Sequence, residues 1–342
     1  MNKFEYLQSA SLDKLLPVLQ EPDTAIKAGG VDIIDLMKEG LTAPSRLVSL
    51  RPITALQKIS LDDDLSIGAG ATIADISNVN NIYAGPFRVL AQACASLATP
   101  QIRHAATIGG NLCQRPRCWY FRSHEFDCTR KGGKICYAMN GENAYHAIFG
   151  NTDGCVIVHP SSPAVALTAL DARLKIKSSK GERELAMDQF FITPANDITK
   201  ENALQPGEVI TEIYIPEPPN GTISFYLRQN EKQSFDWPIA EIAVALAIEN
   251  NICRSARIVL GAAAPIPWRC TDAENLLIGQ AITKESAARA AKKALSNATP
   301  LSKNAYKISV LSFKSSFTSS RRNSSCLTRV SCLAFSARSF PP

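Results

Sequence analysis

The stretch Ala106-Thr107-Ile108-Gly109-Gly110-Asn111-Leu112 joins a hydroxyl, two glycines and an amide side chain in one short turn. Because glycine carries no Cβ, such a turn lets a backbone approach a ligand closely. The chain then passes through four cysteines in a short span, Cys118, Cys128, Cys136 and Cys155. Thiolates gathered in this way indicate a metal centre or a disulfide framework, depending on the compartment. We interpret most of the other segments as a scaffold around residues 106–155.

The bulk composition is that of an ordinary globular protein. At roughly 150 residues per domain, a chain of 342 residues holds about two domains. The net charge of +6 is modest and the basic residues are mostly scattered, so we expect no nucleic-acid partner. Residues 1–6 form no apolar signal core and no later apolar run is long enough to span a bilayer, so we expect no membrane association. Ten cysteines in such a chain favour thiols or metal ligands over structural disulfides.

Another glycine turn, which comes first in chain order, follows the first clear predicted strand. Residues 24–27 are predicted to form the strand, Ala28-Gly29-Gly30-Val31-Asp32-Ile33 the turn, and a helix then runs to Lys38. Such a turn places backbone N–H groups at a helix N-terminus, where hydrogen bonds and the helix dipole favour a phosphate. The alternative interpretation is a tight connection that binds nothing.

Hydrophobic periodicity predicts further elements of both kinds. The predicted helices cover residues 11–20, 72–76, 86–97, 164–170, 238–248 and 284–296. The predicted strands cover residues 46–50, 56–59, 65–69, 172–176, 209–215 and 256–260, and residues 223–228 are expected to begin the second domain. The proline-rich segment 216–221 is predicted to separate two domains. The residues after 307 are rich in serine and arginine without an acidic side chain, which predicts a disordered tail or a reading-frame change near Val310.

Three motifs in a fixed order carry a family resemblance. They are residues 28–33, residues 106–112, and Gly261-Ala262-Ala263-Ala264-Pro265 with Pro267-Trp268-Arg269. From about residue 3 to about 307, the chain resembles the FAD-binding subunit of the xanthine dehydrogenase family of molybdenum hydroxylases. The resemblance implies an α+β fold. A two-part FAD-binding domain of the vanillyl-alcohol oxidase (PCMH) type would span 1–217, and a smaller α+β flavoprotein C-terminal domain 221–307, followed by an atypical tail over 308–342.

The resemblance also implies which residues contact FAD. The implied contacts in the two glycine loops are Lys27, Ala28, Gly29, Gly30, Val31, Asp32 and Ile33, and then Thr107, Gly109, Gly110 and Asn111. The segment His159-Pro160-Ser161-Ser162 resembles a His-Pro-Ser-Asp segment that touches FAD, and it implies contacts from Ser161 and Ser162. Here Ser162 stands where the family has an aspartate, so one carboxylate acceptor is missing. Ile210 and Arg228 match further contact positions.

The cysteines lie in an insertion at about 113–155 that most FAD subunits of the family lack. It resembles the insertion of 4-hydroxybenzoyl-CoA reductase and of periplasmic aldehyde oxidoreductases, whose FAD subunits carry an extra [4Fe–4S] cluster. The implied ligands are Cys118, Cys128, Cys136 and Cys155. Their spacing differs from that of compact zinc sites, although structural zinc stays an alternative. The basic residues nearby would offset the charge of a thiolate-ligated cluster, or else form a solvated surface; they are Arg115, Arg117, Arg122, Arg130, Lys131 and Lys134.

The expected function is therefore that of an oxidoreductase subunit that transfers electrons. Electrons would pass between a [2Fe–2S] small subunit and an external acceptor by way of FAD, and the molybdenum cofactor would lie on a large partner subunit. Because flavin chemistry needs no protein nucleophile, we expect no catalytic side chain. The alternatives are a self-sufficient flavin oxidoreductase and an assembly subunit without FAD. We expect a cytoplasmic location, or a periplasmic one if the complex is exported through a signal on the small subunit.

Overall fold

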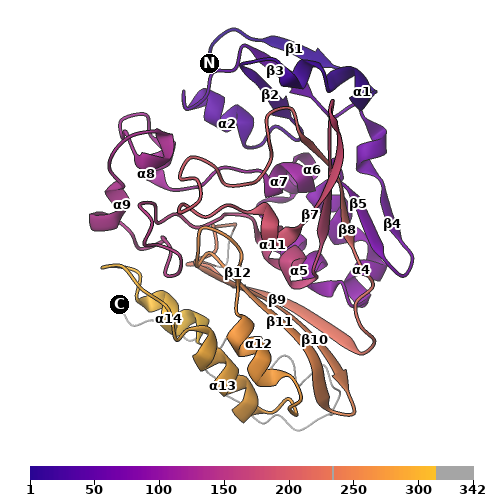
Figure 1. The fold of residues 1–342 in the computed structure, drawn as a ribbon, viewed down its shortest axis with the longest axis vertical. Helices are drawn as coiled ribbons and strands as arrows, with labels where there is room; N and C mark the ends of the chain where they lie inside the picture. Colours follow the sequence, from indigo (N-terminus) through magenta and orange to yellow (C-terminus); the bar gives the residue numbers. More distant parts are fainter. Residues whose placement is uncertain (233–234, 313–342) are drawn as a thin grey trace.

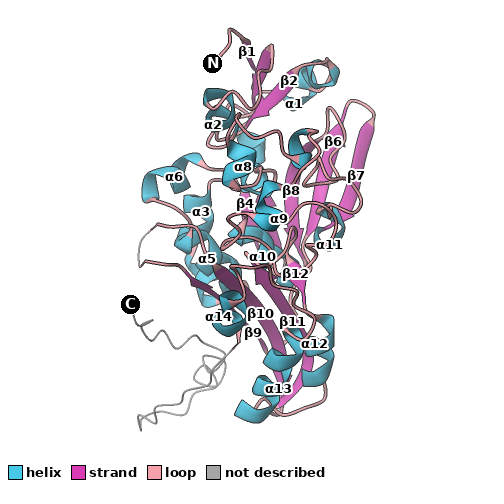
Figure 2. Ribbon diagram, turned by 90° about the vertical axis from the view of Figure 1, so that its left-hand side faces the viewer, coloured by secondary structure: helices cyan, strands magenta, loops and turns pink. Residues whose placement is uncertain are grey.

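The structure, a computed structural model, describes residues 1–232 and 235–312 (Figure 1). Its strands form three separate sheets with helices packed between and beside them (Figures 1 and 2). Two sheets belong to the part of the chain before Pro216, and the third belongs to the part after it. Among the residues described, no helix is both long enough and apolar enough to span a bilayer.

The first sheet is parallel and carries the first glycine turn at the end of an edge strand. Its strands, in spatial order, are β1 (Glu5–Gln8), β3 (Arg46–Ser49) and β2 (Thr24–Lys27). The helix predicted over 11–20 is divided into α1 (Leu12–Leu15) and the 3₁₀ helix η1 (Val18–Gln20), because Pro17 has no N–H for a continuing helix. Apolar residues of both pieces still pack with β3 in one buried cluster.

The second sheet is antiparallel and supports the largest core. Its strands, in spatial order, are β4 (Ile59–Leu61), β5 (Leu65–Gly68), β8 (Val209–Ile215), β6 (Arg173–Ser178) and β7 (Gly181–Ala186). Two helices of this core are α5 (Arg88–Ser96) and α10 (Ser162–Ala169), which pack on each other. Every residue of α10 is buried, as expected for a helix that is apolar on nearly all sides.

The third sheet corrects one prediction. The segment 238–248, predicted to be a buried helix, contains β10 (Ala240–Glu249), which pairs with β9 (Thr222–Gln229) and β11 (Ile252–Gly261). Helices α5 and α10 pack on this sheet, and so do α12 (Thr271–Leu277) and α14 (Tyr306–Leu311) (Figure 1). Because β10 is buried by neighbours on both faces, it is a continuous apolar run without alternation. Periodicity cannot distinguish such a run from a buried helix.

The other differences from prediction are local. Residues 56–59, predicted as a strand, belong to the 3₁₀ helix η2 (Thr54–Gln57) and the start of β4. Residues 308–311, which we assigned to the atypical tail, belong to α14, whose Leu311 is buried in the core of the third sheet. The rest of the predicted tail, 313–342, lies outside the described residues. The remaining elements are α2 (Ile33–Lys38), α3 (Ile73–Asn78), α4 (Asn80–Ala84), α6 (Pro100–Ala105), α7 (Ile108–Leu112), α8 (Trp119–Arg122), η3 (Thr129–Lys131), α9 (Tyr137–Asn140), α11 (Met187–Phe190), β12 (Trp268–Arg269) and α13 (Lys284–Ala294).

Candidate cofactor site

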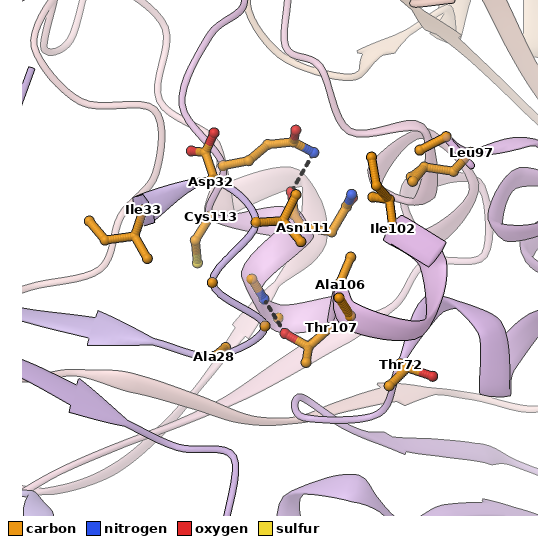
Figure 3. A pocket seen from close by; sticks show the side chains of 18 of the residues that line it. Ala28, Asp32, Ile33, Thr72, Leu97, Ile102, Ala106, Thr107, Asn111 and Cys113 are labelled. Carbon is orange, nitrogen blue, oxygen red and sulfur yellow. Dashed lines mark hydrogen bonds between the residues drawn. The ribbon is translucent and has the colours of Figure 1, made fainter. Parts of the chain in front are cut away.

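A cleft of about 690 Å³ lies against the two glycine loops (Figure 3). This volume falls within the range of small-molecule and cofactor sites, roughly 300–1,000 Å³. Its walls come from segments far apart in the chain, which include 28–36, 50–57, 69–72, 97–117, 204–210 and 235–238, with single residues from α10 and β9. The fold therefore brings together both glycine motifs identified in the sequence.

The first glycine loop is held against the second by close backbone contact. A Cβ on Gly29 would lie 2.1 Å from the carbonyl oxygen of Ala105, so this position has no room for a side chain. Gly30 has a φ of +85°, a backbone conformation that side chains disfavour. Lys27, the last residue of β2, lies with its side chain beside Gly30. The glycines are thus needed to join the two loops.

The second loop is organised by Thr107, which caps the short helix α7. Its Oγ1 accepts a hydrogen bond from the N–H of Gly110 at 3.2 Å (Figure 3). A Cβ on Gly109 would lie 2.8 Å from the Cβ of Ala69, so this glycine is also set by packing. The side chain of Asn111 accepts a hydrogen bond from the hydroxyl of Ser161 at 2.6 Å. This bond joins the second loop to the N-terminus of α10.

Ser161 and Ser162 have different environments at the start of α10. Ser161 caps the helix, because its Oγ accepts from the N–H of Ala164 at 3.1 Å. Ser162 lines the cleft and donates its hydroxyl hydrogen to Oε1 of Glu241 at 2.6 Å. Glu241 is 2% exposed, and burial raises its pKa to about 7. Sequence analysis did not identify this carboxylate, because it lies on β10, a segment that we predicted to be helical.

The structure gathers most of the predicted FAD contacts in this cleft. All of the predicted contact residues line the cleft except Lys27 and Ser161. Lys27 packs beside Gly30, and Ser161 donates a hydrogen bond to Asn111. Their roles toward FAD stay predictions. Other lining residues were missed by sequence reasoning, including Thr72, Ile102, His104, Leu204 and Trp237. Thr72 had a local signal, since it forms a capping box with Asp75 at the start of α3.

The four cysteines of the insertion line a second, small cavity. Cys118, Cys128 and Cys136 occupy the N-cap positions of α8, η3 and α9, and Cys155 follows in an extended segment. Among the residues that the structure describes, no group of three His, Cys, Asp or Glu side chains is arranged to hold a single metal ion. Four chain segments nevertheless converge on one point through their cysteines.

Buried polar groups surround these sulfurs. The Nε of Arg130 lies 3.5 Å from the Sγ of Cys155, and its Nη1 forms an ion pair with Glu201 at 2.7 Å. A hydrogen bond from Cys136 and the charge of Arg130 lower the pKa of Cys155 to about 6, although burial opposes them. The Nε2 of His146 lies 3.2 Å from the Sγ of Cys118. Arg130 is 3% exposed, so the solvated-surface interpretation does not hold for it.

The insertion is attached to the first glycine loop by ion pairs. Asp32 accepts hydrogen bonds from the backbone N–H of Arg115 and the guanidinium of Arg122, each at 2.8 Å, and pairs with Arg117 at 2.8 Å. Leu36 on α2 lines the cleft and also packs in one apolar cluster with Phe121 and Cys128. In Figure 1, α8 and α9 lie on the same side of the molecule as α2. Leu36 of α2 therefore connects the wall of the cleft with the apolar cluster beside the cysteine cavity.

A glycine-walled cleft in the part before Pro216, followed by a sheet covered by helices, agrees with two known flavoprotein domains. Residues 2–218 match the FAD binding domain in molybdopterin dehydrogenase, and residues 225–311 match the CO dehydrogenase flavoprotein C-terminal domain. The chain belongs to this family of molybdopterin dehydrogenase FAD-binding proteins. The predicted resemblance is thereby confirmed, and so is the class of flavoprotein oxidoreductase subunits.

Several relatives extend over most of the chain. It is 30% identical over 282 residues to the aldehyde oxidoreductase FAD-binding subunit PaoB of Escherichia coli (strain K12), covering 81% of this chain and 86% of that protein. It is 25% identical over 300 residues to the carbon monoxide dehydrogenase medium chain of Hydrogenophaga pseudoflava, covering 87% and 88%. A solved structure of carbon monoxide dehydrogenase from Hydrogenophaga pseudoflava has a TM-score of 0.70 at 24% identity, covering 91% of this chain and 94% of that chain. The predicted fold class is confirmed.

Proposed function

We propose that this chain is the FAD- and [4Fe–4S]-carrying electron-transfer subunit of a heteromeric molybdenum hydroxylase. Its partners would be a large subunit with the molybdenum cofactor and a small subunit with [2Fe–2S] clusters. Electrons would pass between the small subunit and an external acceptor. The observation that carries the proposal is the position of Leu36 on α2, which lines the cleft and packs in one apolar cluster with Cys128 of the cysteine cavity.

The cleft has the features that FAD binding requires. Its two glycine loops place backbone N–H groups beside the cavity, and such groups hold phosphates. The lining residues Ala28–Ile33, Thr107, Gly109–Asn111, Ser162, Ile210 and Arg228 would contact the cofactor. Lys27 and Ser161 would hold the loops in place. The bound flavin would supply the redox chemistry, while the protein binds and orients it.

The cysteine cavity fits a four-iron cluster by its chemistry. Cys118, Cys128, Cys136 and Cys155 line one cavity, and four thiolates are the usual ligand set of a [4Fe–4S] cluster. Arg130 supplies a buried positive charge beside the sulfurs. A ligated cluster with a net negative charge would be stabilised by this group.

The two sites are connected by the chain itself. Asp32 belongs to the first glycine loop, and its carboxylate binds Arg115, Arg117 and Arg122 of the insertion. The arginines of the insertion therefore hold a residue of the cleft wall in place. In turn, Asp32 of the cleft wall holds the insertion that carries the cysteines. The insertion supplies an electron carrier next to the flavin, and its position supports electron transfer as the role of the chain.

Protein purified without oxygen tests the proposal by absorbance and iron analysis. We expect flavin bands with a broad iron–sulfur shoulder in the full-length protein. Cys128→Ser should lose the shoulder and the cluster iron while FAD stays bound. The matched control is Cys253→Ser, because Cys253 is also buried but lies on β11 outside both cavities. An unchanged iron content in the Cys128 variant would contradict the assignment of Cys128 as a cluster ligand. A colourless wild-type protein would favour an assembly subunit without FAD.

The compartment and the assembly follow from the same proposal. No disulfide joins the cysteines within residues 1–232 and 235–312, as expected for a protein of the reducing cytoplasm. We propose that the complex resides in the cytoplasm, unless the small subunit carries an export signal. Fractionation of the native organism, with activity staining and detection of this chain, would test this location by showing whether both appear in the cytoplasmic fraction. Recovery of the large and small subunits with the tagged chain would test the assembly.

A further inference from the structure

The carboxylate of Glu241 is buried beneath the cleft and has no role in the function described so far. It lies on β10 opposite Arg228 of β9 and opposite Gly261 of β11. A Cβ on Gly261 would lie 2.3 Å from Oε2 of Glu241 and 2.6 Å from a methyl group of Val165. The carboxylate therefore occupies space that exists because residue 261 is a glycine.

Ser162 connects this carboxylate with the cleft. Its hydroxyl donates to Oε1 of Glu241 at 2.6 Å, a short bond of the kind formed with ionised acceptors. A serine hydroxyl has one hydrogen and two acceptor lone pairs. Since the hydrogen is engaged by Glu241, the Ser162 oxygen can only accept a hydrogen bond, either from the buried hydroxyl of Tyr226 beside it or from a ligand in the cleft.

We propose that Ser162 and Glu241 form a two-residue acceptor for FAD. In this pair Glu241 holds the Ser162 hydrogen, and the Ser162 oxygen accepts a hydrogen bond from a hydroxyl or N–H group of the cofactor. The proposal rests on the FAD function proposed for the cleft. It assigns Ser162 as the contact and Glu241 as a positioning residue that acts through it.

The surroundings of Glu241 make this acceptor sensitive to pH near neutrality. Burial raises the pKa of Glu241 to about 7, while Ser162, Tyr226, Arg228 and Lys307 limit the rise. These groups face the carboxylate from α10, β9 and α14, and β11 adds Gly261 without a charge. The carboxylate form prevails above pH 7, so FAD binding should strengthen as pH rises through this value. Below it, a neutral carboxyl group can donate to Ser162 and release the serine hydrogen toward the cleft.

The test is the FAD dissociation constant of the full-length protein at pH 6 and pH 8, measured by flavin fluorescence after the flavin is removed. Wild type should bind roughly fivefold more tightly at pH 8, the difference between a charge-assisted and a neutral hydrogen bond. Glu241→Gln keeps the shape of the side chain and should bind equally at both pH values. Ser162→Ala should bind more weakly than wild type at pH 8 and show no pH effect.

A second buried carboxylate provides the control. Glu274 on α12 is 3% exposed and pairs with Arg269, but it does not line the cleft. Glu274→Gln should therefore keep the wild-type pH profile even where it lowers thermal stability. A pH effect that persists in Glu241→Gln would belong to another group, such as Lys307, and would overturn the inference while FAD binding stands. Wild-type protein that binds no FAD would overturn the proposed function as well.

Discussion

The insertion is attached to the first glycine loop by the contacts of Asp32 with Arg115, Arg117 and Arg122. The substitution Asp32→Asn should weaken this attachment. The carboxylate is 16% exposed, and its Arg117 and Arg122 partners are 23% and 13% exposed. In Asp32→Asn the negative charge is lost, and one carboxylate oxygen is replaced by an amide NH₂ group that cannot accept a hydrogen bond from the arginines. Hydrogen bonds to charged groups contribute about 1.5–3 kcal/mol each, so two weakened contacts should lower the free energy of unfolding by about 3 kcal/mol. We expect a fall in Tm of about 6–12 °C in a domain of this size.

Asp35, three residues later on α2, offers a matched comparison. It contacts the same two arginines at 3.5 and 3.1 Å, but its side chain is 46% exposed. An exposed pair contributes about 1 kcal/mol or less, so Asp35→Asn should shift Tm by less than about 4 °C. Thermal unfolding of both variants as full-length protein, followed by flavin and iron release, measures the difference. Equal shifts in the two variants would refute the idea that Asp32 anchors the insertion.

Two further predictions concern buried charges. Arg130→Gln leaves Glu201 with the more exposed Arg115 as its ion-pair partner. We therefore expect the free energy of unfolding, measured in urea, to fall by about 3 kcal/mol in Arg130→Gln and by about 1 kcal/mol in Arg115→Gln. Similar losses in the two variants would contradict the argument that burial makes the Arg130 pair the more important one. Burial lowers the pKa of Lys307 to about 7, so the unfolded chain binds one more proton than the folded chain between pH 7 and the ordinary value of 10.5. The free energy of unfolding should therefore rise by up to about 1.4 kcal/mol per pH unit across this window. Lys307→Met should abolish this rise. If the variant keeps the pH dependence of the wild type, Lys307 is charged in the folded protein.

The cleft was predictable because its requirements are local. Gly29 and Gly109 face backbone or Cβ atoms where no side chain fits, and Gly30 has a positive φ. Such constraints are visible in the sequence as glycine motifs in a fixed order. The strands 24–27 and 209–215 were also predicted well, because their composition matches their secondary structure.

The parts that escaped prediction depend on long-range contacts. The burial of Arg130 depends on Glu201, which lies 71 positions away. The Ser162–Glu241 pair spans 79 positions and involves a strand that periodicity alone presents as a helix. The absence of the family aspartate at Ser162 appeared to be a lost carboxylate, but the fold places Glu241 against the same residue. A neighbouring strand can supply a group that a motif lacks.

The proposed function requires that one chain holds both a flavin and an iron–sulfur cluster. Iron, acid-labile sulfide and FAD, measured together in the anaerobically purified full-length protein, test this requirement directly, with electron paramagnetic resonance after reduction. We expect about four iron atoms and four sulfides per FAD and the signal of a reduced [4Fe–4S] cluster. FAD without iron, or one zinc ion per chain in place of iron, would contradict it.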